Sequence, residues 1–217
     1  MNRHHANWGI AHDYLAVAGC CRSPRRWPAA LLRCLLVLIT AGCTLLATAS
    51  VHADVYDDRR TRAGVRLFRS LLSAEIGIEN KAAEDGKLHL LILGGEREQL
   101  EELVALLAPQ KADQQAKLRG VPVSVDTVDE WVSDSADSVA GVFLAEIPSD
   151  DELERLIAWS VEHKVMLYSP FEGHVERGVM AGISIEAKVR PFLNVGSLEA
   201  AGLKLKPLYM KVAKVHR

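Results

Sequence analysis

The chain has 217 residues, a quarter of them charged, and a formal net charge of −2. The charge is uneven, because residues 54–217 hold 21 basic and 27 acidic side chains, a net charge of −6, whereas residues 1–53 are basic. Phosphate contacts supply most of the affinity for nucleic acids, so an acidic domain of this kind predicts no nucleic-acid partner.

Residues 1–53 have the pattern of a secretory signal. Arginines precede the uncharged run CLLVLITAGCTLLATASV, and VHA closes it with small residues at the cleavage positions, which predicts cleavage after Ala53. Two alternatives stay open. The run 34–51 is long enough for a membrane anchor, and ITAGC resembles a lipobox that would lipidate Cys43. In each case the arginine bias places the domain outside the cytoplasm, in the periplasm.

The predicted domain, residues 54–217, contains no cysteine. All four cysteines lie before residue 54, at Cys20, Cys21, Cys34 and Cys43. The domain therefore enters an oxidising compartment without a disulfide and depends on its hydrophobic core. Its length is ample for one such core.

The first half of the domain alternates helix and strand. RTRAGVRLFRSLLSAEIG, residues 60–77, has apolar residues at helical spacing and predicts an amphipathic helix with its arginines on the other side. LHLLILGG (88–95) predicts a buried strand, and EREQLEELVALLAPQ (96–110) a helix ended by Pro109. VPVSVDTV (121–128) and SVAGVFLAEI (138–147) predict two more strands.

The second half continues the alternation. SDDELERLIAWSVEHK (149–164) predicts a helix capped by Ser149, and VMLYSPF (165–171) a strand. Residues 178–187 and 188–195 can pair as a hairpin, followed by a short helix at 196–202 and a final helix at 206–214. This order predicts an α/β fold, a single three-layer sandwich with a mainly parallel central sheet and an antiparallel edge.

The C-terminal glycines have structural interpretations. Gly178 and Gly182 flank a strand that we expect to pass close to another backbone, and Gly202 suits a helix C-cap. Gly94 and Gly95 follow the first strand, where a Rossmann-type fold holds phosphate. They lack the third glycine or the P-loop lysine, so we expect an ordinary turn and no cofactor.

Catalytic and metal-binding patterns are sparse. The domain has no G-x-S-x-G motif and four histidines, so we expect no enzyme. Glu172, His174 and Glu176 alternate and would share one face of an extended segment, a spacing that could ligate a metal. Gly173 instead favours an ordinary loop at this segment.

Trp159 lies off the apolar stripe of its predicted helix, about 120° from the centre by the helical step of about 100° per residue. The offset predicts a partly exposed side chain. Two roles stay open for it, as the anchor of a protein interface or as a cover for a neighbouring loop.

The C-terminal segment FLNVGSLEAAGLKLKPLYMKVA, residues 192–213, resembles the end of the YfiR-like family (the DUF4154 domain). The resemblance rests on Asn194 in a short strand, an Ala-rich helical turn, AGL at Gly202 and a final apolar helix reaching Ala213. GVMAGISI, RAGVRLFRSLL and LHLLILG resemble earlier elements of the family, which extends the likeness over residues 61–213, although only the last forty residues are specific.

The resemblance implies a small exported α/β domain. Well-known members of the family are periplasmic dimers that restrain a membrane-bound diguanylate cyclase and so set cyclic-di-GMP signalling, and others lie beside sensor kinases or receptors. Residues 54–217 lack the family's cysteines, so redox control does not carry over. Pro191, Phe192 and Leu193 also stand where the family has an acidic residue, which makes the chain a divergent member.

Two functions follow as expectations. The first is a non-enzymatic regulatory domain that binds an inner-membrane signalling protein and touches the membrane only through an uncleaved or lipidated N-terminus, with a homodimer left open. The alternative is a periplasmic small-ligand-binding module, in which Arg177, Arg190 and Asn194 would contact an anionic ligand.

Overall fold

The computed structural model describes residues 58–109, 115–129, 131 and 139–217. The predicted signal, with Cys43 and the apolar run 34–51, lies outside these residues. The described residues belong to one compact unit by their contacts. No helix within the described ranges is long and apolar enough to cross a membrane.

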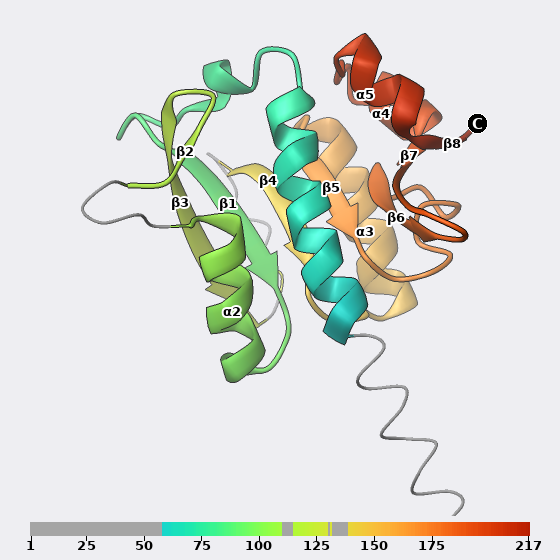
Figure 1. Cartoon of the computed structure of the whole chain (residues 1–217), viewed down its shortest axis with the longest axis horizontal. Helices are drawn as coiled ribbons and strands as arrows, with labels where there is room; N and C mark the ends of the chain where they lie inside the picture. The colour runs from blue at the N-terminus through green and yellow to red at the C-terminus, as the bar shows by residue number, and fades with distance from the viewer. Residues whose placement is uncertain (1–57, 110–114, 130, 132–138) are drawn as a thin grey trace, which may run out of the picture. The chain divides into compact units, whose positions relative to one another are not determined.

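In the described part of the chain, eight strands form one sheet in the order β2-β3-β1-β4-β5-β6-β7-β8 (Figure 1). Five neighbouring pairs are parallel, and the pairs β2–β3 and β6–β7 are antiparallel. The strands are β1 (Leu88–Leu93), β2 (Lys117–Leu118), β3 (Val121–Val128), β4 (Val139–Leu144), β5 (Met166–Ser169), β6 (Ala181–Ile185), β7 (Val189–Asn194) and β8 (Lys214–His216).

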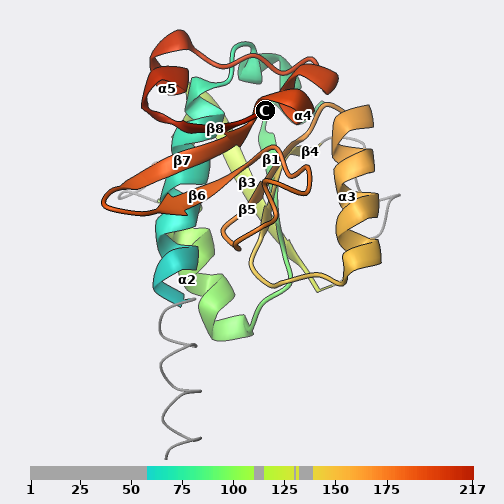
Figure 2. The ribbon, with the colours of Figure 1, turned by 90° about the vertical axis from the view of Figure 1, so that its right-hand side faces the viewer.

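Helices cover both faces of the sheet. A helix at residues 58–74 lies with α2 (Arg97–Leu107) on one face, and α3 (Asp150–Glu162) lies on the other (Figure 2). Three short helices complete the described part: η1 (Ile78–Lys81), α4 (Val195–Ala200) and α5 (Pro207–Val212). The predicted three-layer sandwich, with a mainly parallel sheet and antiparallel pairs toward its edges, is confirmed.

Each interface between layers has its own apolar cluster. On the side of helix 58–74, Phe68 packs against Phe143 and Tyr168, with ring centroids 5.7 and 5.5 Å apart. On the other side, Leu153 and Leu156 of α3 are fully buried against the sheet. Continuous apolar strands such as β1 are buried on both faces for this reason.

Local signals in the sequence are mostly confirmed. Ser149 caps α3 by accepting a hydrogen bond from the Glu152 N–H, and Gly202 has a φ of +69° just after α4. Gly182 lies close to a neighbouring backbone, since a Cβ built on it would lie 2.6 Å from the Ser169 carbonyl oxygen.

Two expectations need correction. The arginines of helix 58–74 do not all face away from the core, because Arg60 lies on the buried side and is 5% exposed. The chain also does not end in a helix: α5 stops at Val212, and β8 follows and pairs parallel to β7. Strand β8 is three residues long, too short for an alternation of apolar and polar residues to reveal it.

Candidate functional site

A pocket of about 280 Å³ opens beyond the carboxyl ends of β5 and β6. Ligands of open α/β sheets bind at this kind of edge. We call it the Arg60 pocket; its lining consists of Arg60, Phe171, Glu172, Gly173, Val175, Glu176, Ile183, Ser184, Ile185, Glu186, Phe192 and Lys214.

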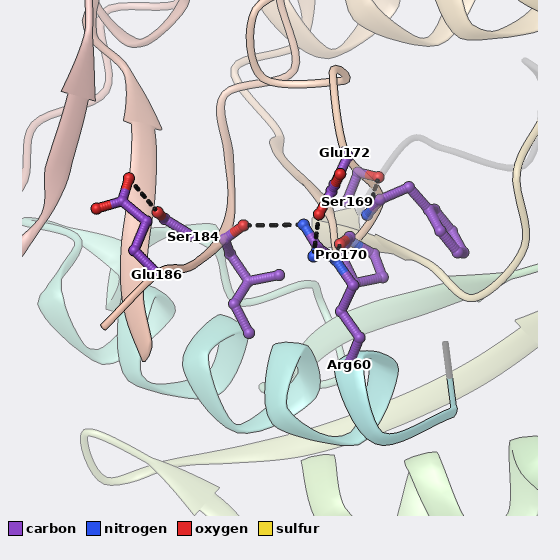
Figure 3. Close-up of polar contacts among 8 residues, drawn as sticks. Arg60, Ser169, Pro170, Glu172, Ser184 and Glu186 are labelled. Carbon is purple, nitrogen blue, oxygen red and sulfur yellow. Dashed lines mark hydrogen bonds and ion pairs between the residues drawn. The ribbon is translucent and has the colours of Figure 1, made fainter. Parts of the chain in front are cut away.

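Arg60 reaches the pocket from the first turn of helix 58–74 (Figure 3). Its Nε donates to the Pro170 carbonyl and its Nη2 to the Ile183 carbonyl at 3.2 Å, so the segment after β5 and strand β6 hold the guanidinium in place. Its Nη1 lies 2.8 Å from Oε1 of Glu172, whose side chain is 78% exposed. The ion pair with Glu172 is therefore the solvent-side contact, the one that another carboxylate could replace.

Glycine brings this helix close to β5. A Cβ built on Gly64 would lie 3.0 Å from Cβ of Pro170, so Gly64 allows the helix to approach the loop that Arg60 contacts. Gly64 and Arg60 of the helix therefore both depend on the loop at Pro170, the first through close packing and the second through a hydrogen bond.

Glu186 organises the opposite wall of the pocket. Its carboxylate accepts hydrogen bonds from Lys214 at 2.9 Å, from Arg190 at 3.1 Å and from the Ser184 hydroxyl at 3.3 Å. The hydrogen bond and charge of Lys214 hold the pKa of Glu186 below its ordinary value, with Arg190 adding to the effect. The pocket therefore presents fixed charges of both signs.

An apolar pair continues the pocket onto the surface. Ile185 and Val189 are directly opposite each other at the end of the β6–β7 hairpin, and they are 37% and 54% exposed. Residues directly opposite in an antiparallel pair share one face of the sheet. Arg190 follows Val189 and is opposite Ser184, so it lies on the other face of the hairpin, where it pairs with Glu186. We call the end of the hairpin formed by Ile185, Val189 and Arg190 the hairpin surface.

A serine–histidine pair lies beneath the pocket. Oγ of Ser169 accepts from the Phe171 N–H at 3.2 Å and is hydrogen-bonded to Nδ1 of His174 at 2.8 Å. Burial, and then the charge of Arg177, lower the pKa of His174, while Asp150 opposes the change. Ser169 is fully buried, so a substrate cannot reach this hydroxyl in the described arrangement.

The metal site expected at Glu172, His174 and Glu176 required an extended segment, and this expectation is wrong. Residues 172–178 form turns, with a φ of +80° at Gly173, and not the extended segment that would place the three side chains on one face. His174 points inward to Ser169, whereas both glutamates are exposed and line the Arg60 pocket. Within the described ranges, no group of three His, Cys, Asp or Glu side chains could hold a metal ion.

The three residues proposed to contact an anion do not form one site. Arg177 pairs with Asp150 at the start of α3, at 2.6 Å. Both ends of the Asn194 amide are engaged, because its Oδ1 accepts from the Ser197 N–H and its Nδ2 donates to the Val175 carbonyl. Arg190 belongs to the hairpin surface, where Glu186 pairs with it. Both arginines are therefore paired within the chain, and Asn194 is a helix cap.

Trp159 is 8% exposed, so the expectation of partial exposure is wrong. The ring of Trp131, which precedes β4, lies edge-on to that of Trp159 with centroids 4.4 Å apart, and the His163 ring stacks on Trp159 at 4.8 Å. The second of the two roles that the sequence left open, in which Trp159 lies over a neighbouring loop, agrees with the contact to Trp131.

The glycine turn after β1 is closed by the chain itself. The Gly95 N–H donates to a carboxylate oxygen of Glu146 at 3.3 Å, and a Cβ on Gly94 would lie 2.7 Å from Cβ of Glu146. A carboxylate therefore holds the amide that a phosphate would need, which agrees with an ordinary turn.

No family model and no curated protein match the chain. Two similar solved structures are an ABC domain in complex with L-Trp from Streptococcus pneumonia (14% identity, TM-score 0.45) and a conserved domain protein from Vibrio cholerae O1 biovar El Tor (12% identity, TM-score 0.42). The matches cover 72% and 65% of this chain, and the chain spans about three fifths of each structure. These matches leave the function of the chain open.

Proposed function

We propose that residues 54–217 are an exported, non-enzymatic regulatory domain that binds a membrane signalling protein through the Arg60 pocket and the hairpin surface. The observation that carries the proposal is the exposed pair Ile185 and Val189 beside a pocket with fixed charges. An apolar centre with a charged rim is the usual composition of a protein interface.

The resemblance to the YfiR-like family supports the kind of partner. Two of the matching segments, residues 178–185 and 192–213, supply β6 and half of β7, the strands of the hairpin. The family implies an inner-membrane enzyme such as a diguanylate cyclase or a sensor kinase. We propose that this domain restrains such an enzyme.

A binding role also agrees with the polar groups at the carboxyl edge of the sheet. The Ser169 hydroxyl is buried against His174, and the Gly95 amide is paired with Glu146. Exposed charged groups line the Arg60 pocket, where they can recognise a side chain of a partner.

A photo-crosslinking residue at Val189 in living cells tests this proposal. We expect an adduct with an inner-membrane protein at this position, and its loss when Ile185→Asp is added, because a charge would disrupt the apolar centre. The control position is Ile147, which is 59% exposed but lies outside the hairpin. Equal adducts at both positions, or none at Val189, would contradict the proposal.

The buried arginine favours a second candidate, a module that binds a small carboxylate. Glu172 is exposed and replaceable at Arg60, and the pocket is of a size for a small molecule. Native mass spectrometry of protein purified without refolding should then show added mass. Glu172→Gln should strengthen carboxylate binding because it removes the competing group. Glu176→Gln is the matched control, since Glu176 lines the same pocket; equal effects of both variants would refute this candidate.

A further inference from the structure

One end of the domain combines exposed apolar side chains with lysines. Ile76, Leu208 and Val212 are 54%, 75% and 53% exposed, three of the six most exposed large apolar side chains in the described part of the chain. The exposed lysines of the segment around α5 accompany them. We call Ile76, Lys204, Lys206, Leu208, Lys211 and Val212 the α5 surface.

Backbone contacts bring these residues to the same end. The Ile76 N–H donates to the Lys204 carbonyl at 2.8 Å, and the Lys206 N–H donates to the Ala74 carbonyl at 2.9 Å. Both ribbon views place α5 beside the C-terminal end of helix 58–74 (Figures 1 and 2). Leu208, Lys211 and Val212 follow the i, i+3, i+4 spacing that puts side chains on one helix face.

The other face of α5 is already committed to the core. Tyr209, Met210 and Ala213 pack against the cluster under helix 58–74, and the Tyr209 hydroxyl donates to the Leu67 carbonyl at 3.3 Å. Burial raises the pKa of Tyr209, as expected for a phenol held in this packing. The outer side chains are therefore presented on a helix that is fixed from behind, and they add nothing to the core.

The charge of the α5 surface indicates the kind of partner that it contacts. Residues 203–217 contain five basic and no acidic side chains, whereas residues 54–202 have a net charge of −11. Of the five, Lys204, Lys206 and Lys211 belong to the α5 surface, while Lys214 lines the Arg60 pocket. Charges further away than the Debye length, about 8 Å at physiological salt, are screened. A partner that contacts the α5 surface is therefore affected mainly by the lysines of that surface and much less by the negative charge of the rest of the domain. A second copy in a two-fold contact through this face would bring like charges together.

We propose that the α5 surface docks on an anionic phospholipid membrane, with Leu208 and Val212 entering the interface and the lysines contacting the head groups. Apolar side chains ringed by lysines on a fixed helix face are suited to the boundary between head groups and acyl chains. This proposal is independent of the proposed function, which uses the Arg60 pocket and the hairpin surface.

Vesicle co-sedimentation of residues 54–217 provides the test, because this domain contains the whole described sheet and both core clusters. We expect binding to vesicles of phosphatidylcholine with phosphatidylglycerol, little binding to phosphatidylcholine alone, and weaker binding as salt rises. Lys204→Glu, Lys206→Glu and Lys211→Glu together should reduce the affinity at least on the order of tenfold. Leu208→Ser with Val212→Ser should reduce it without changing the charge.

Matched variants exclude a general effect of charge or polarity. Arg97→Glu, Lys117→Glu and Arg155→Glu change exposed residues elsewhere by the same total charge, and Ile147→Ser removes an exposed apolar side chain elsewhere. These should bind like the unmodified domain. Equal loss in the control variants, equal binding to both vesicles, or absence of binding would overturn the proposal. So would a dimer in light scattering that Leu208→Ser with Val212→Ser abolishes, because it would assign the face to a second copy.

Discussion

At the scale of single residues, His174 connects packing to pH. Burial lowers the pKa of His174 from its ordinary 6.5, so the folded domain binds this proton less readily than the unfolded chain does. The free energy of unfolding should therefore be highest above pH 6.5 and fall with acid below it, by at most about 1.4 kcal/mol per pH unit. Urea unfolding between pH 8 and pH 5.5 measures this slope.

The variant His174→Asn isolates the cause, because its amide oxygen can still accept from Ser169. It should remove the fall in stability between pH 6.5 and pH 5.5. The control His89→Asn changes a histidine beside Asp85 and Asp126 on β1 and should keep that fall. An unchanged slope in His174→Asn would show that another group titrates.

Sequence reasoning did not identify Arg60 as part of the candidate site. Arg60 lies eight residues before Phe68, on the buried stripe that also contains Gly64 and Val65. Extending the helical period back from Phe68 would have found it, but a charged residue at the end of an amphipathic helix is usually solvated. Its partners are backbone carbonyls more than a hundred residues away, and no local pattern contains them.

At the scale of elements, two glycines in the C-terminal segment should respond in opposite ways to alanine. Gly182 in β6 has no room for a Cβ, which would meet the Ser169 carbonyl oxygen at 2.6 Å, so Gly182→Ala should cost about 1–3 kcal/mol. Gly196 lies in α4, where a Cβ meets its nearest neighbour at an ordinary 3.4 Å, and Gly196→Ala should stabilise by roughly 0.5–1 kcal/mol. Thermal and urea unfolding of the pair measures both signs; a loss of stability in both would contradict the structure.

Elements with a strong period were predictable, and those made by distant pairing were not. The helices of residues 97–107 and 150–162 and the strand β1 show their period and caps in the sequence. Strands β2 and β8 have two and three residues, and each exists because a neighbouring strand offers free backbone groups. The antiparallel β6–β7 pair was predictable because a short polar turn joins two apolar runs.

At the scale of the whole molecule, the three layers and the mainly parallel sheet followed from the alternation of helix and strand, but the polar contacts between layers did not. Glu75 at the end of helix 58–74 is 1% exposed and pairs with Lys81 at 2.6 Å. Lys81 also donates to the carbonyl of Lys164, which follows α3, and Arg119 donates to the Glu75 carbonyl. One end of the fold is therefore tied together by residues from distant segments, whose meeting the sequence does not indicate.

Breaking this ion pair from the lysine side should be the more damaging change. Lys81→Met leaves the buried Glu75 carboxylate without its partner and should cost about 3–5 kcal/mol, whereas Glu75→Gln leaves a neutral amide and should cost less. Burial already raises the pKa of Glu75, an effect that Lys81 opposes. A raised folded-state pKa contributes stability that is lost as the pH rises. The Lys81→Met variant should therefore have a lower free energy of unfolding at pH 8 than at pH 5. The double variant Glu75→Gln with Lys81→Met should lose this pH difference in urea unfolding. If Lys81→Met were no more harmful than Glu75→Gln at pH 8, the pair would be a surface contact and not a buried tie between the layers.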